Sequence, residues 1–242
     1  MSSQDFDDII NTLLSQIWSL KERDARYLCE LYLRSACQKH LFAETRLKNL
    51  RSKIAYRKRR YTIVKHEGYV EARYPQNTLS IEMDFDHCIL SLRSSLEHLA
   101  QLVNALIPLN LPPKGKTRES VNLKRVIDIL HNTPSLRSIP SLDELSTNLR
   151  IETVSTRYNE LHDLRIESFH IKSGRLPHMK HTTREHDLID LKFLLPDGTA
   201  TSLKTEEERD ILNYCKSRVN DVQRTLNGSF HVLSKYMSYK LG

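Results

Sequence analysis

The side chains best suited to chemistry in this chain are an arginine and a histidine, Arg165 and His170, in the segment LRIESFH. A guanidinium can hold a phosphate and offset the charge that develops on it in a transition state. An imidazole can take a proton from a hydroxyl or give one to a leaving oxygen. Together they could split a phosphodiester bond whose nucleophile is a neighbouring 2′-hydroxyl, which RNA has and DNA lacks.

The spacing of this pair does not identify it, because eight of the eleven histidines follow an arginine by five to seven positions. Its context is more specific. An apolar helical stripe runs through Val154, Tyr158 and Leu161, and its next position is Arg165. A cation at a core position needs an anionic partner or a polar cleft.

A helix end is needed for the two side chains to face one site, because residues five apart on a continuous helix point about 140° apart. The stretch IKSG followed by Pro177 offers that end. The structural alternative is that Arg165 pairs with Asp163 or Glu167 and that His170 is satisfied at the helix terminus.

Positive charge is concentrated in one segment, RLKNLRSKIAYRKRR, which spans residues 46–60 and holds no acidic residue. Its basic residues are Arg46, Lys48, Arg51, Lys53, Arg57, Lys58, Arg59 and Arg60. Without these eight, the remaining 29 lysines and arginines nearly equal the 30 acidic residues, so the net charge of +7 lies here. Such a segment predicts binding to RNA or another polyanion, and Tyr56 and Tyr61 could stack on bases. A solvated helix end is the alternative.

Helical periodicity dominates the chain and predicts a mainly α protein, an antiparallel helical bundle with long N-terminal helices and one or two short β-hairpins. The expected helices span 4–20, 24–56, 81–107 and 120–131, then from Ser141 toward His170, and from Thr205 toward Tyr239. Hairpins are expected at 61–74 and near 188–203, the second around a Pro-Asp-Gly turn at 196–198. Two capping boxes, Ser141/Glu144 and Thr205/Glu208, and Ser80 as an N-cap would start helices. Residues 1–79 would form the N-terminal helices and hairpin, and residues 80–242 the bundle core.

Several classes of function have no signature here. There is no phosphate-binding glycine loop, no serine-nucleophile elbow and no long apolar run, so we expect no cofactor and no membrane association. The four cysteines lack CxxC pairing and indicate a cytoplasmic protein with reduced thiols. His178 and His181, in an expected loop with His186 nearby, form a weak metal-binding pattern, and we expect no metal.

The helix DFDHCILSLRSSLEHLA and the later segment RIESFH together resemble the HEPN (higher eukaryotes and prokaryotes nucleotide-binding) superfamily over about residues 80–175. The resemblance implies a helical bundle, pairing into a homodimer, and metal-independent RNA cleavage with Arg165 and His170 as the catalytic pair. Members commonly carry a polar residue directly after the arginine, where this chain has Ile166.

The sequence therefore predicts a HEPN-like protein that binds or cleaves RNA, with a role in a stress or phage-defence system. The alternative is a non-catalytic interaction or dimerisation module built on the long N-terminal helices.

Overall fold

The computed structural model describes residues 3–60, 62–66, 69–73, 79–107, 109, 111–112, 121–153, 158–161, 164, 178–184, 187–195 and 205–242. These residues form two compact units. Unit 1 comprises residues 1–40, 92–159 and 220–242, and unit 2 comprises residues 41–91 and 160–219. The boundary predicted near residue 80 lies inside unit 2.

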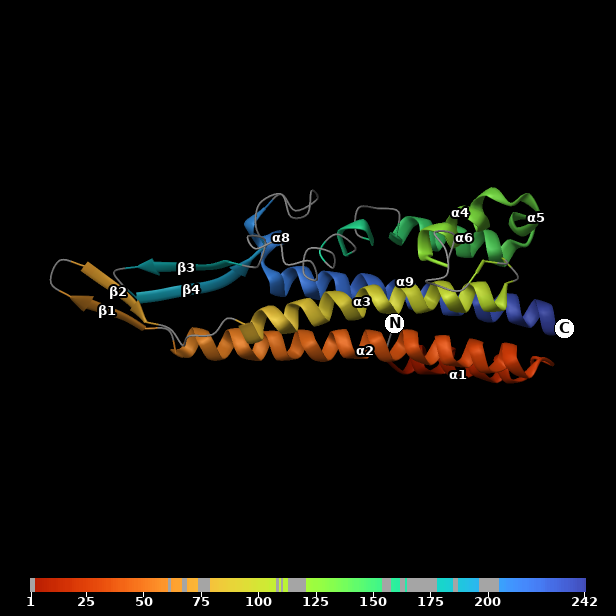
Figure 1. The fold of residues 1–242 in the computed structure, drawn as a ribbon, viewed down its shortest axis with the longest axis horizontal. Coiled ribbons are helices and arrows are strands. Elements are labelled where there is room, and N and C mark those ends of the chain that lie inside the picture. The colour runs from red at the N-terminus through yellow and green to blue at the C-terminus, as the bar shows by residue number, and fades with distance from the viewer. Residues whose placement is uncertain are drawn as a thin grey trace. The chain divides into compact units, whose positions relative to one another are not determined.

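The described residues are mainly helical, as the sequence predicted (Figure 1). The helices are α1 (Ser3–Trp18), α2 (Arg23–Arg60), α3 (Leu79–Leu106), α4 (Leu123–Asn132), α5 (Pro134–Arg137), α6 (Pro140–Thr153), α8 (Glu206–Arg209) and α9 (Ile211–Leu241). Two antiparallel hairpins join β1 (Thr62–His66) to β2 (Tyr69–Arg73) and β3 (His178–Arg184) to β4 (Asp187–Leu194). α2, α3 and α9 each contribute one part to each unit.

Unit 1 is a helical bundle with an apolar centre. The predicted stripe on α3 is confirmed, because Leu92, Leu96, Leu99 and Val103 are all buried here. α1 packs on the end of α9: the rings of Phe6 and Phe230 stack with centroids 6.1 Å apart, and Gln16 donates to the Ser234 carbonyl at 3.1 Å. α4, α5 and α6 complete the unit (Figure 1).

The start of α6 corrects one prediction. Ser141 was expected to cap this helix with Glu144, but the helix already begins at Pro140. Proline favours the first helical position because its φ is preset and it has no N–H to satisfy. Ser141 therefore lies inside the helix, and Glu144 instead accepts from Lys235 of α9 at 3.2 Å. Ser80 likewise lies within α3, which begins at Leu79.

Unit 2 contains the C-terminal part of α2, the first turns of α3 and both hairpins. The strand near residues 188–195 was predicted, but its described partner is different. β4 pairs with β3, which precedes it and which sequence analysis treated as a loop. The returning strand that was expected after Pro196 falls on residues outside the described part of the chain.

The last helix is interrupted near its start. The capping box of Thr205 and Glu208 is confirmed, but it opens only the short helix α8. Asp210 then adopts an extended conformation, with φ −60° and ψ 121°, and ends α8. Its carboxylate accepts from the backbone N–H groups of Leu212 and Asn213 at 2.9 and 3.2 Å, so that it caps α9.

The four cysteines are free thiols, and three of them are fully buried. Burial raises the pKa of Cys29 to about 11 and that of Cys37 to about 12. Burial, followed by a hydrogen bond with Cys88, also raises the pKa of Cys215. Thiols that stay protonated at neutral pH are poor nucleophiles, so these buried cysteines contribute to packing rather than to chemistry.

Candidate nucleic-acid interface

The eight basic residues of segment 46–60 all lie on the last part of α2, within unit 2. They do not share one environment, because a helix rotates by about 100° per residue and the segment covers four turns. Leu47, Leu50 and Ile54 are buried and fix the inner side of the helix. The cations divide into those that contact the rest of unit 2 and those that face away from it.

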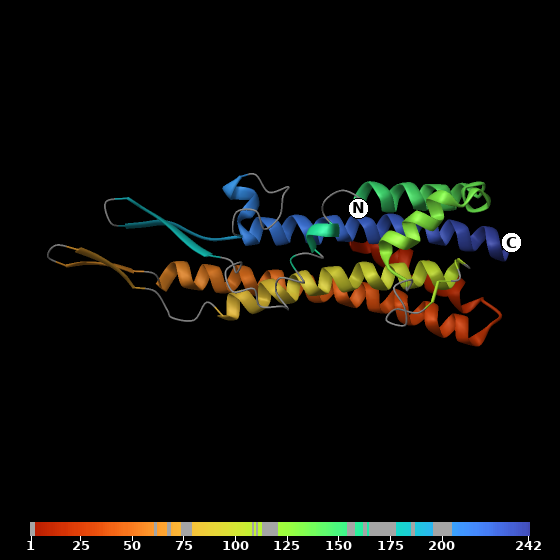
Figure 2. The ribbon, with the colours of Figure 1, turned by 45° about the horizontal axis from the view of Figure 1, so that its top comes forward.

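Two of the cations hold a buried carboxylate. Asp84 of α3 is only 2 % exposed, and its two oxygens lie 3.2 Å from Arg46 Nη1 and 2.5 Å from Lys53 Nζ. Lys53 also donates to the backbone carbonyl of Ser80 at 3.0 Å. An ionised carboxylate at this depth needs both partners, because burial without them would be very costly. Arg46 and Lys53 thus join α2 to α3. The two helices run side by side there (Figure 2).

A third cation serves packing. Arg57 is 5 % exposed, and its guanidinium carbon lies 5.9 Å from the centroid of the Phe193 ring on β4. A guanidinium over an aromatic face is attracted by the ring's negative π-cloud. This contact fastens the end of α2 to the second hairpin, and it leaves Arg57 buried rather than open to a ligand.

The outward cations form a continuous surface, which we call the basic face: Lys48, Arg51, Lys58 and Arg59. All four are exposed, and helical geometry places them within an arc of about 100°. Arg60 is exposed as well, and its guanidinium lies 5.3 Å from the ring centroid of Tyr56. No acidic residue interrupts positions 46–60, so the potential along this surface is positive.

The sequence-predicted catalytic pair is outside the described residues, as are Asp163 and Glu167. Two members of the predicted apolar stripe, Tyr158 and Leu161, are described and buried, as is the adjacent Leu164. The pairing of Arg165 with His170 therefore stays a prediction.

The histidine-rich segment differs from the expected loop. Positions 178 and 181 both lie in β3, where successive positions alternate between the two faces of the strand. Within the described part of the chain, no group of three or more ligating residues could hold a metal ion.

A buried polar cluster in unit 1 was missed by sequence analysis. Arg93 and Glu97, one turn apart on α3, are 2.7 Å apart and almost fully buried. The Tyr158 hydroxyl donates to the same Glu97 oxygen at 3.2 Å, and the Arg93 guanidinium lies 3.6 Å above the Tyr158 ring. The i,i+4 spacing of Arg93 and Glu97 could have suggested the ion pair, but not its aromatic partner. The cluster holds Tyr158 against α3 within unit 1.

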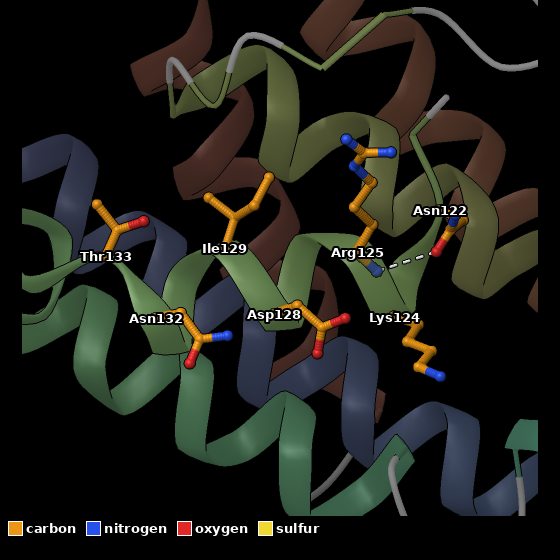
Figure 3. A pocket seen from close by; sticks show the side chains of 7 residues that line it. All are labelled: Asn122, Lys124, Arg125, Asp128, Ile129, Asn132 and Thr133. Atoms are coloured by element: carbon orange, nitrogen blue, oxygen red, sulfur yellow. Dashed lines mark hydrogen bonds between the residues drawn. The ribbon is translucent and has the colours of Figure 1, made fainter. Parts of the chain in front are cut away.

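One surface depression, of about 520 Å³, lies along α4. Its lining residues come from that helix and its two caps. In Figure 3, Arg125 and Ile129 point to one side of the helix, whereas Lys124 and Asn132 point to the other. Side chains that diverge in this way do not converge on a ligand, so we assign no site to the depression.

Comparison of the chain with known protein families, with curated proteins and with solved structures found no match. Among the helices of the described residues, none has both the length and the apolar character required to cross a membrane.

Proposed function

We propose that this protein binds RNA through the basic face of α2. The observation that carries the proposal is the set of four exposed cations on one side of the helix, in a segment without acidic residues. A polyanion gains affinity there mainly by releasing condensed counterions, so the interaction is sequence-independent and sensitive to salt. The unpaired cysteines are compatible with an RNA-binding protein of the cytoplasm.

The division of the cations sharpens this proposal. Arg46, Lys53 and Arg57 are engaged with Asp84 and Phe193, so they contribute less to a ligand than the sequence count of eight suggests. The RNA contacts belong to the basic face. RNA cleavage by Arg165 and His170 remains the catalytic extension of the proposal, and it needs the bound strand to reach that pair.

Binding of a fluorescent RNA, measured by anisotropy at several salt concentrations, tests the proposal. A variant with Lys48, Arg51, Lys58 and Arg59 all changed to Gln should bind at least about tenfold more weakly. The slope of log K against log salt should shrink in magnitude by about 3, because each phosphate contact to a single strand contributes about 0.7.

A matched control changes four exposed cations outside the basic face: Lys21→Gln, Arg23→Gln, Lys124→Gln and Lys216→Gln. This variant loses the same net charge but should keep most of the affinity and of the salt slope. Equal losses in the two variants would mean that net charge alone attracts RNA, and undiminished binding by the first variant would refute the proposed interface.

A further inference from the structure

Beside the basic face, α2 carries a second set of exposed side chains that are not cationic. Phe42 and Tyr56 are 44 % and 49 % exposed, and Asn49 and Ser52 lie between them on the surface. Helical geometry places these four within an arc of about 80°, adjoining the basic face. We call them the aromatic stripe. All of its members lie on the part of α2 that belongs to unit 2.

The aromatic stripe has the groups that unpaired bases require. Aromatic rings stack on any base, and amide and hydroxyl groups can hydrogen-bond to base edges. Neither the Asn49 amide nor the Ser52 hydroxyl is hydrogen-bonded to another described residue. Phe42 and Tyr56 are 14 positions apart, or about 21 Å along the helix axis, a distance that several nucleotides of an extended strand cover.

Cations border the stripe on both sides. The basic face lies along one edge, and Arg60, with the partly exposed Arg46 and Lys53, lies along the other. Arg60 lies 5.3 Å from the Tyr56 ring, so a guanidinium is already beside the ring on which a base would stack. A strand lying along the stripe would therefore have its phosphates next to positive charge while its bases contact the rings.

A duplex cannot use the stripe in the same way. The major groove of A-form RNA is too deep and narrow for side chains to read. The major groove of B-form DNA is about 12 Å wide and admits one α-helix. Here the Asp84 pairs hold α3 along one side of α2 within unit 2 (Figure 2). In a duplex the bases are also paired and stacked on one another, so their faces are not open to stack on Tyr56, whereas unpaired bases are.

We propose that the aromatic stripe makes the α2 surface selective for single-stranded RNA, with Tyr56 as a base-stacking platform. This inference rests on the proposed function, RNA binding by the basic face. The basic face supplies affinity for any RNA, and the stripe distinguishes unpaired from paired strands. Tyr56 is the decisive residue because it is exposed, aromatic and within the basic segment itself.

The test measures binding of the full chain to three probes of about 12 nucleotides, a usual site size for single-strand binding. The probes are an unstructured RNA, the same RNA annealed to its complement, and the corresponding DNA duplex. Tyr56→Leu, which keeps apolar bulk and helix propensity but removes the ring, should weaken binding of the single strand by about 5- to 150-fold. Its affinity for the RNA duplex should equal that of the parent.

Two further variants complete the design. Tyr56→Phe keeps the ring and should bind the single strand like the parent. Tyr27→Leu removes an exposed tyrosine from the part of α2 in unit 1 and should have no effect.

The stripe proposal is overturned if Tyr56→Leu binds the single strand as the parent does, if it loses affinity equally for the RNA duplex, or if the DNA duplex binds more tightly than the single-stranded RNA. Each of these results leaves the proposed function intact, provided that the four-glutamine variant of the basic face still loses affinity.

Discussion

At the scale of single residues, Asp84 engages two cations of the basic segment, Arg46 and Lys53. Removing both cations should destabilise the fold more than removing the charge of Asp84. Changing Arg46 and Lys53 together to Gln leaves a nearly inaccessible carboxylate unpaired, which should lower the free energy of unfolding by about 3 kcal/mol. Asp84→Asn should cost only about 1 kcal/mol, because both cations are about 40 % exposed and can hydrate.

Urea denaturation of each variant measures these costs. Lys48→Gln combined with Arg51→Gln is the control on the exposed side of the same helix, and it should change stability by no more than about 0.5 kcal/mol. If Asp84→Asn costs as much as the double cation variant, the carboxylate is not stabilised in the way that its burial indicates.

The sequence alone indicated in part which cations of the basic segment are engaged within the fold and which are exposed. Leu47, Leu50 and Ile54 mark the buried side of α2, and a further step of three places Arg57 on that side as well. The partners Asp84 and Phe193 were not predictable, because each lies on another element far along the chain. A charge count therefore located the basic segment correctly, but it could not determine which cations are engaged within the fold.

At the scale of elements, helix starts show which local signals are reliable. Thr205 and Glu208 form the predicted capping box at the start of α8. Ser141 and Glu144 have the same spacing, but Pro140 begins the helix one residue earlier. The pairing of β3 with β4 was missed because a Pro-Asp-Gly turn after β4 was a stronger local signal than the histidine-rich segment before it.

The break at Asp210 gives an element-scale prediction. Asp210→Ala removes the acceptor for the first N–H groups of α9, so the free energy of unfolding should fall by about 1 kcal/mol. Asp210→Asn keeps a side-chain oxygen and should retain most of the stability. Thermal denaturation followed by circular dichroism compares the two variants. Equal melting temperatures for Asp210→Ala and the parent would show that the cap contributes nothing measurable.

At the scale of the whole molecule, the mainly helical architecture followed from periodicity, but the division into units did not. α2, α3 and α9 each contribute to both units, so each unit is assembled from segments distant in sequence. A sequence reader looks for boundaries in loops and places one near residue 80. The long helices continue through the positions where one compact unit gives way to the other, so no loop marks the division.

The catalytic prediction also belongs to this scale, because it requires that an RNA bound at α2 be cut by a pair of residues elsewhere in the chain. The parent protein should cleave a structured RNA in the presence of EDTA, since a guanidinium and an imidazole can perform the reaction without a metal. The products should end in a cyclic phosphate, because the attacking group is the adjacent 2′-hydroxyl. His170→Ala should abolish cleavage and leave the affinity for RNA unchanged.

A second histidine variant separates chemistry from folding. His98→Ala changes a histidine that also follows an arginine by five positions, but its Nδ1 lies 2.7 Å from the Ser94 carbonyl within α3. It should cleave RNA at the parental rate. If His170→Ala cleaves as fast as the parent, or if the parent does not cleave at all, the nuclease prediction fails and RNA binding by the basic face has to account for the function. Retained binding with lost cleavage would assign affinity to α2 and catalysis to His170.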